Sequence, residues 1–114
     1  MLDPININGA EHYLWGDGCD GWHFVKTEDL SVIQERVPPG QSERKHYHEK
    51  SRQFFYVLEG TATLEVAHQS FILREREGIE VSPMTPHRLL NKSAEDLVFL
   101  VVSAPKSHGD RIDV

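Results

Sequence analysis

The feature that most restricts the fold of this chain is a series of short segments rich in aromatic and β-branched residues, each ended by turn-forming residues. Pro38-Pro39-Gly40 cannot continue a central strand, because proline lacks the amide hydrogen that a strand donates, and Glu59-Gly60 is typical of a hairpin corner. No window of helical length carries an apolar stripe. The pattern predicts an all-β sandwich or small barrel. Strands are expected over residues 22–25, 30–37, 53–58, 61–66, 70–73, 78–81 and 97–102.

The length of the chain limits it to one domain. Its 114 residues can bury one core, whereas two cores would each be near the smallest size that folds unaided. We therefore expect a single domain over residues 1–114, in which residues 1–20 add a strand or form an arm exchanged in a dimer. The polar tail, residues 106–114, is expected to be loose. Uncovered sheet edges favour a homodimer.

Charge and cysteine content exclude several classes of function. The formal net charge of −6 argues against binding to nucleic acid or to an anionic membrane, since both require a basic surface. Cys19 is the only cysteine, so neither an internal disulfide nor a cysteine-built zinc site is expected. The apolar run Leu97–Val102 is too short to cross a bilayer. Because the start resembles no signal peptide, a cytoplasmic location is expected.

Three of the seven histidines form the most informative chemical pattern. His46 and His48 are two residues apart, so in a strand both imidazoles lie on one face and can hold one metal ion. Gln53 opens the next predicted strand, and His87 follows the proline-rich turn Pro83–Pro86. In an antiparallel barrel, positions this far apart in sequence can converge on one interior point.

The spacing of these residues resembles the first motif of the cupin superfamily, G-x5-H-x-H-x3–4-E-x6-G. The chain has Gly40, His46, His48, Gln53 and Gly60 at matching intervals, and Gln53 is the only departure because the motif has glutamate there.

The second cupin motif, roughly G-x5-P-x-G-x2-H-x3-N, is matched by Pro83, His87 and Asn91, while Met84 replaces the loop glycine. The two motifs cover residues 40–91, about half of the chain. The resemblance implies a small jelly-roll β-barrel, the double-stranded β-helix of cupins. It also implies that one divalent transition metal ion, of the set Zn, Ni, Mn or Fe, is bound by His46, His48, Gln53 and His87.

Gln53 carries the most information about the chemistry of such a site. A glutamine carbonyl leaves the charge of the cation unneutralised, which favours Lewis-acid polarisation of a substrate oxygen. The alternative is that Gln53 touches no metal and that a three-histidine site remains, because a neutral amide is a weak ligand. Three or four protein ligands leave coordination positions open for water or substrate.

The sequence identifies no catalytic residue, but four side chains are candidates. Arg44 and Arg111 can anchor an anionic substrate, His108 can act as acid or base, and Tyr56 can supply a phenol if the strand register slips. The alternative for each is an ordinary solvated or packed side chain. Asn91 is expected to hold a loop by hydrogen bonding and not to bind the ion.

Three functions are consistent with this pattern. The first is a metal-dependent isomerase or lyase that polarises a small polar or anionic metabolite, with a sugar acid as one candidate substrate. The second is a dioxygenase with mononuclear iron. The third is a cupin that binds a small molecule without turnover. A fold of this kind hosts many unrelated functions and does not choose among them.

Overall fold

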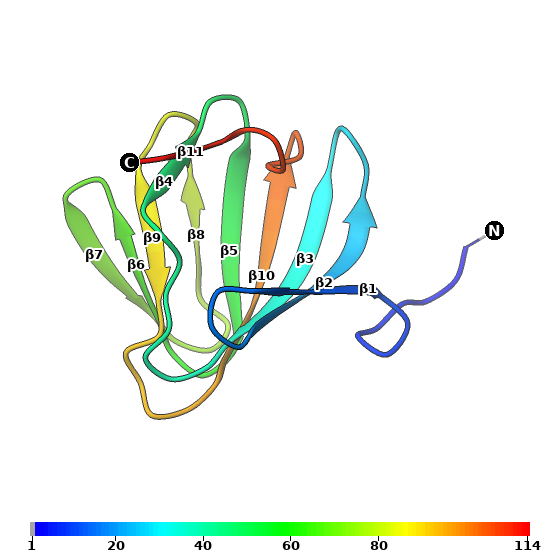
Figure 1. The fold of residues 1–114 in the computed structure, drawn as a ribbon, viewed down its shortest axis with the longest axis horizontal. Coiled ribbons are helices and arrows are strands. Elements are labelled where there is room, and N and C mark those ends of the chain that lie inside the picture. Colours follow the sequence, from blue (N-terminus) through cyan, green and yellow to red (C-terminus); the bar gives the residue numbers. More distant parts are fainter. Residues whose placement is uncertain (1) are drawn as a thin grey trace.

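The computed structural model describes residues 2–114 and contains eleven strands and no helix among them. Their order along the chain is shown in Figure 1. The strands are β1 (Glu11–Trp15), β2 (Cys19–Lys26), β3 (Ser31–Val37), β4 (His46–His48), β5 (Arg52–Glu59), β6 (Ala62–Val66), β7 (Gln69–Leu73), β8 (Gly78–Val81), β9 (His87–Leu90), β10 (Leu97–Ala104) and β11 (Arg111–Asp113). Within residues 2–114, no helix of a length and hydrophobicity that would cross a membrane occurs.

The strands form two antiparallel sheets. The first has the order β1-β2-β3-β10-β5-β8 and the second the order β11-β4-β9-β6-β7, so neighbours in a sheet are often distant in sequence (Figure 1). Buried and half-buried residues alternate along β10, which shows that one face of this central strand lies against the core. The core joins the inner faces of both sheets and includes Val57, Leu64 and Phe99. The all-β prediction is confirmed.

Every strand expected from the sequence is present, with small differences at the ends. In residues 1–20, where an added strand or an exchanged arm is expected, β1 pairs with β2 of the same chain. The structure adds the short strands β4 and β9, which pair through His46 and His87. A strand of only three or four residues is too short for a periodic hydrophobic signal.

The C-terminal tail is not loose, and this prediction was wrong. Residues 111–113 form β11, which pairs with β4. The Asp110 carboxylate accepts hydrogen bonds from the backbone N–H groups of Glu49, Lys50 and Ser51 at 3.1, 3.0 and 2.9 Å. A polar segment can be fixed in this way by backbone pairing, which composition alone does not reveal.

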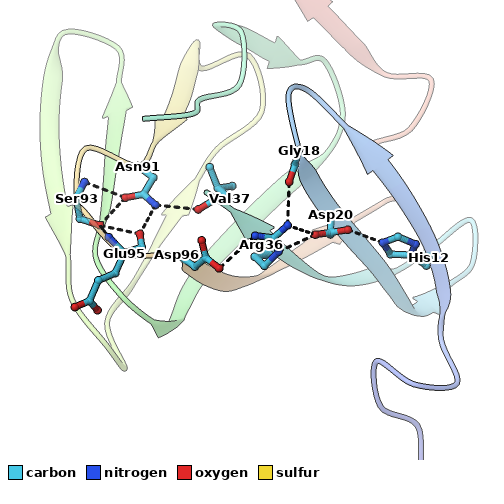
Figure 2. Close-up of polar contacts among 9 residues, drawn as sticks. All are labelled: His12, Gly18, Asp20, Arg36, Val37, Asn91, Ser93, Glu95 and Asp96. Atoms are coloured by element: carbon cyan, nitrogen blue, oxygen red, sulfur yellow. Dashed lines mark hydrogen bonds and ion pairs between the residues drawn. The ribbon is translucent and has the colours of Figure 1, made fainter. Parts of the chain in front are cut away.

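Polar networks connect the end of β3 with the segment after β9 and with β2 (Figure 2). The Asn91 side chain, which is 1% exposed, donates to the carbonyls of Val37 and Glu95 and accepts from the backbone and hydroxyl of Ser93. It holds the loop that follows β9 by hydrogen bonding, as predicted. In the same view, Arg36 bonds to Asp20 on β2.

Gly60 provides a test of the hairpin between β5 and β6. Its φ of 83° lies in the left-handed region, and an added Cβ would lie 2.5 Å from the backbone oxygen of Asp96. We expect Gly60→Ala to lower the free energy of unfolding by about 2 kcal/mol, measured by urea titration.

Gly40→Ala is the matched control for that substitution. Gly40 has a φ of 81°, but nothing lies near an added Cβ, so only the conformational cost of about 1 kcal/mol applies. Equal losses for the two variants would contradict a steric role for Gly60.

Candidate metal centre

The three histidines predicted from the motif meet inside the barrel. His46 and His48 lie on β4 and point to one face, and His87 begins β9 directly opposite His46. All three are buried, with exposed fractions of 3%, 5% and 2%. One nitrogen from each ring can be chosen so that the three atoms lie within 4.8 Å of one another. Three imidazoles at this separation can share one metal ion.

Backbone carbonyls orient two of these rings. The Nδ1 of His46 lies 2.7 Å from the Arg44 oxygen, and the Nδ1 of His87 lies 2.9 Å from the Thr85 oxygen. A carbonyl only accepts a hydrogen bond, so Nδ1 carries the hydrogen in both rings and Nε2 keeps its lone pair. This arrangement is typical of histidines that bind a metal. His48 differs, because its Nδ1 is buried without a hydrogen-bond partner among the described residues.

Gln53 lies beside His87, and its contacts fit a cation. Its amide nitrogen donates to the Ser103 hydroxyl at 3.0 Å, which turns the amide oxygen towards the Nε2 of His87 at 3.1 Å. A neutral His87 has one ring hydrogen, already directed at Thr85, so two electron-pair donors face each other here. A cation bound by both atoms resolves that contact. The donor set therefore fits a divalent metal ion.

Burial keeps the imidazoles in the form that binds metals. It is the main cause that lowers the pKa of His46 to about 4, with smaller contributions from the charges of His87 and Arg111 and against the hydrogen bond to the Arg44 carbonyl. Burial likewise lowers the pKa of His48 and His87. Neutral imidazole is the ligand form, so protons do not compete for the site near neutral pH.

A cavity of about 440 Å³ opens over this centre. It is lined by His46 and His48 on β4, by Gln53 on β5, and by groups from β1, β3, β10 and the tail. Of the four candidate side chains, the structure brings His108 and Arg111 to its wall.

Arg44 and Tyr56 are not among the lining residues, which corrects those two candidates. The Arg44 side chain is 84% exposed because it precedes β4 in an irregular segment. Tyr56 lies on the face of β5 opposite Gln53 and stacks on Phe54.

Three cavity residues were missed in the sequence: Tyr13, Glu35 and Glu43. The Tyr13 hydroxyl donates to Glu35 Oε2 at 2.5 Å, and Glu43 Oε1 accepts from the backbone N–H of Leu89 at 3.0 Å. Burial raises the pKa of Glu35 to about 7, and burial with the nearby Glu35 charge raises that of Glu43 to about 8. A signal for Glu35 was present, because it shares the inward face of β3 with the core residues Ile33 and Val37.

The chain resembles known proteins in both sequence and structure. A family model described as "Cupin domain" matches residues 33–103. The uncharacterized protein MJ1618 of Methanocaldococcus jannaschii is 31% identical over 89 residues, covering 77% of this chain and 71% of that protein.

Two polyketide proteins are also similar. The polyketide synthase CurC of Streptomyces cyaneus is 33% identical over 78 residues, covering 66% of this chain but only 51% of CurC. The solved structure of the polyketide cyclase RemF from Streptomyces resistomycificus has a TM-score of 0.85 at 17% identity and covers 100% of this chain and 86% of its own, a likeness of fold. Because the family match covers more than half of its residues, this chain belongs to the cupin family.

Proposed function

We propose that this cupin is a metal-dependent enzyme that moves a proton at a carbon atom next to a substrate carbonyl, an isomerase- or lyase-type reaction. The observation that carries the proposal is that His46, His48 and Gln53 of the metal-ligand set line one cavity together with two ionisable carboxyl groups. Enzymes of this kind need an electrophile at the oxygen and an acid–base group near the carbon.

His46, His48 and His87 would hold the ion, with Gln53 as the fourth ligand. A divalent ion of the set Zn, Ni, Mn or Fe would supply Lewis-acid polarisation of a substrate oxygen. None of the four ligands is an anion, so the ion would keep its full charge. The chain orients the imidazoles of His46 and His87 through the carbonyls of Arg44 and Thr85, and burial favours the neutral form of all three.

The cavity supports a small polar metabolite as the substrate. Its volume of about 440 Å³ lies in the range of small-molecule sites. Arg111 lies on its wall, where a guanidinium favours a substrate with an anionic group. A sugar acid fits this description. The names of CurC and RemF add a polyketide, whose cyclisation also involves carbonyl groups, as a second substrate class to test.

The test uses the purified protein loaded in turn with each metal. A 2-oxo acid, a hydroxy ketone, a uronic acid and a short polyketide lactone are incubated with it in D₂O, and proton NMR follows deuterium entering the carbon next to the carbonyl. We expect exchange with at least one compound, and a fall of at least about 100-fold after the metal is removed by a chelator. Re-addition of the metal should restore it.

Other outcomes would support the remaining functions. Oxygen uptake that depends on iron would support a dioxygenase. Metal-dependent ligand binding without exchange or oxygen uptake would support a cupin that only binds its ligand. Either result would contradict the proposal. The homodimer and the cytoplasmic location stay predictions.

A further inference from the structure

We propose that Glu35 is the catalytic residue that accepts and returns the proton, and that Tyr13 is the residue that positions it. This inference rests on the proposed function, because it names the proton-handling group of the same site.

One oxygen of Glu35 is fixed and the other is available. Tyr13 donates to Oε2 at 2.5 Å, which is the only hydrogen bond that the carboxyl group makes within residues 2–114. Oε1 therefore has no protein partner in that part of the chain, and Glu35 lines the same cavity as His46, His48 and Gln53. A carboxyl group oriented in this way can meet a bound molecule.

Tyr13 reaches Glu35 because Gly21 has no side chain. Tyr13 on β1 is paired with Gly21 on β2, and a Cβ added to Gly21 would collide with the Tyr13 ring. The ring therefore lies across β2 towards β3. Burial, and the negative charge of Glu35, raise the pKa of Tyr13, so the phenol keeps its hydrogen and acts as a donor.

Glu43, the other cavity carboxyl group, is also bonded through one oxygen only, but its partner is the backbone. Its Oε1 accepts from the Leu89 amide, and its own amide donates to the Leu89 carbonyl at 3.0 Å. These two bonds hold the segment before β4 against β9. We assign Glu43 a structural role, which leaves Glu35 as the proton-handling group.

The titratable and charged groups that line the cavity with Glu35 come from several elements. They are Tyr13 on β1, Glu43 before β4, His46 and His48 on β4, His108 in the tail and Arg111 on β11. Burial raises the pKa of Glu35 to about 7, against the hydrogen bond from Tyr13 and the charge of Arg111. Near neutral pH both protonation states are populated, as an acid–base group requires.

The proton transfer balances without a further reactant. The carboxylate of Glu35 takes the proton from the substrate carbon, and the C–H electron pair becomes the double bond of an enolate whose charge lies on the carbonyl oxygen. The protonated Glu35 then returns the proton, to the same carbon in exchange or to a neighbouring atom in isomerisation. Substrate and product have the same composition, so no oxidant or reductant is needed.

The first experiment compares deuterium exchange in Glu35→Gln and in Glu80→Gln, the same change on an exposed residue of β8. We expect Glu35→Gln to lose about 10²- to 10⁴-fold in exchange rate at unchanged metal content, with partial recovery in Glu35→Asp. The wild-type rate should rise with pH as Glu35 ionises, and Glu35→Gln should lack that rise. Tyr13→Phe should move the rise to higher pH, because a hydrogen bond that favours the carboxylate is lost.

The second experiment needs no turnover. Oxalate, a dianion that can chelate an open metal position, is titrated into the zinc-loaded protein near neutral pH by calorimetry, in two buffers of different ionisation enthalpy. Wild-type protein should take up a proton, because an anion beside Glu35 raises its pKa, and Glu35→Gln should take up less.

The outcomes separate the two claims. No exchange with any compound overturns the proposed function, while oxalate-linked proton uptake by Glu35 still supports this inference. Exchange that is unchanged in Glu35→Gln, or proton uptake lost only in Glu43→Gln, overturns the inference alone. Failure of oxalate to bind the zinc-loaded protein contradicts both, because each requires an open metal position.

Discussion

Replacing His87 with alanine is expected to reduce metal affinity by at least about 100-fold. The loss of a metal ligand should weaken metal binding more than the loss of a residue that only orients a ligand. The ring is held by Thr85 at Nδ1, its Nε2 lies 3.1 Å from the Gln53 oxygen, and one of its nitrogens lies within 4.8 Å of a nitrogen of each of the other two imidazoles. Its removal leaves two histidines and an amide, which bind a divalent ion weakly. Elemental analysis after gel filtration, with chelator competition for the affinity, measures the effect. His46→Ala should behave alike.

His68→Ala is the matched control for these variants. His68 is exposed in the turn between β6 and β7, so it should keep the full metal content. Circular dichroism checks that each variant retains its strands. If His46→Ala and His87→Ala both keep their metal while folded, the ion lies elsewhere and the assigned centre is wrong.

Replacing Asn91 with alanine should lower the free energy of unfolding by roughly 3 kcal/mol, because buried polar partners are left unsatisfied. The Asn91 amide nitrogen donates to the carbonyls of Val37 and Glu95, at 2.9 and 2.7 Å (Figure 2). The first bond joins the end of β3 to the segment after β9. Urea unfolding measures the change, with an unchanged m-value showing that the same surface is exposed.

Lys92→Ala serves as the control for Asn91→Ala. Its side chain is exposed beside Asn91, so its loss should change stability by less than about 0.5 kcal/mol. A loss below about 1 kcal/mol for Asn91→Ala would mean that water replaces the lost bonds and that the loop does not depend on this residue.

Much of the fold could be predicted from the sequence because its signals are local. The alternation in Arg52–Glu59 and the turn at Gly60 mark strand and hairpin without knowledge of the rest of the chain. The tail could not be predicted in this way. Its order depends on hydrogen bonds from three backbone amides, 59 to 61 residues earlier in the chain, to Asp110, and no pattern within the tail predicts that contact.

The candidate site also contains residues that the sequence predicts and residues that it does not. His46, His48, Gln53 and His87 stand at a fixed spacing, so the sequence indicates them as a set. The Tyr13–Glu35 pair has no such spacing, because it depends on the register of β1 against β2 and on the missing side chain of Gly21. The alternation of β3 marks Glu35 as inward-facing, but only the assembled barrel shows that it lines the same cavity as His46 and His48.

The three imidazoles and the Tyr13–Glu35 pair stand on opposite sheets of the barrel. Substitutions in β1 to β3 can therefore accumulate without disturbing the strands that carry the histidines. Descendants of one ancestral barrel can keep the same ion and change the chemistry by altering a single wall, which offers a physical route to the diversity of reactions found on one scaffold.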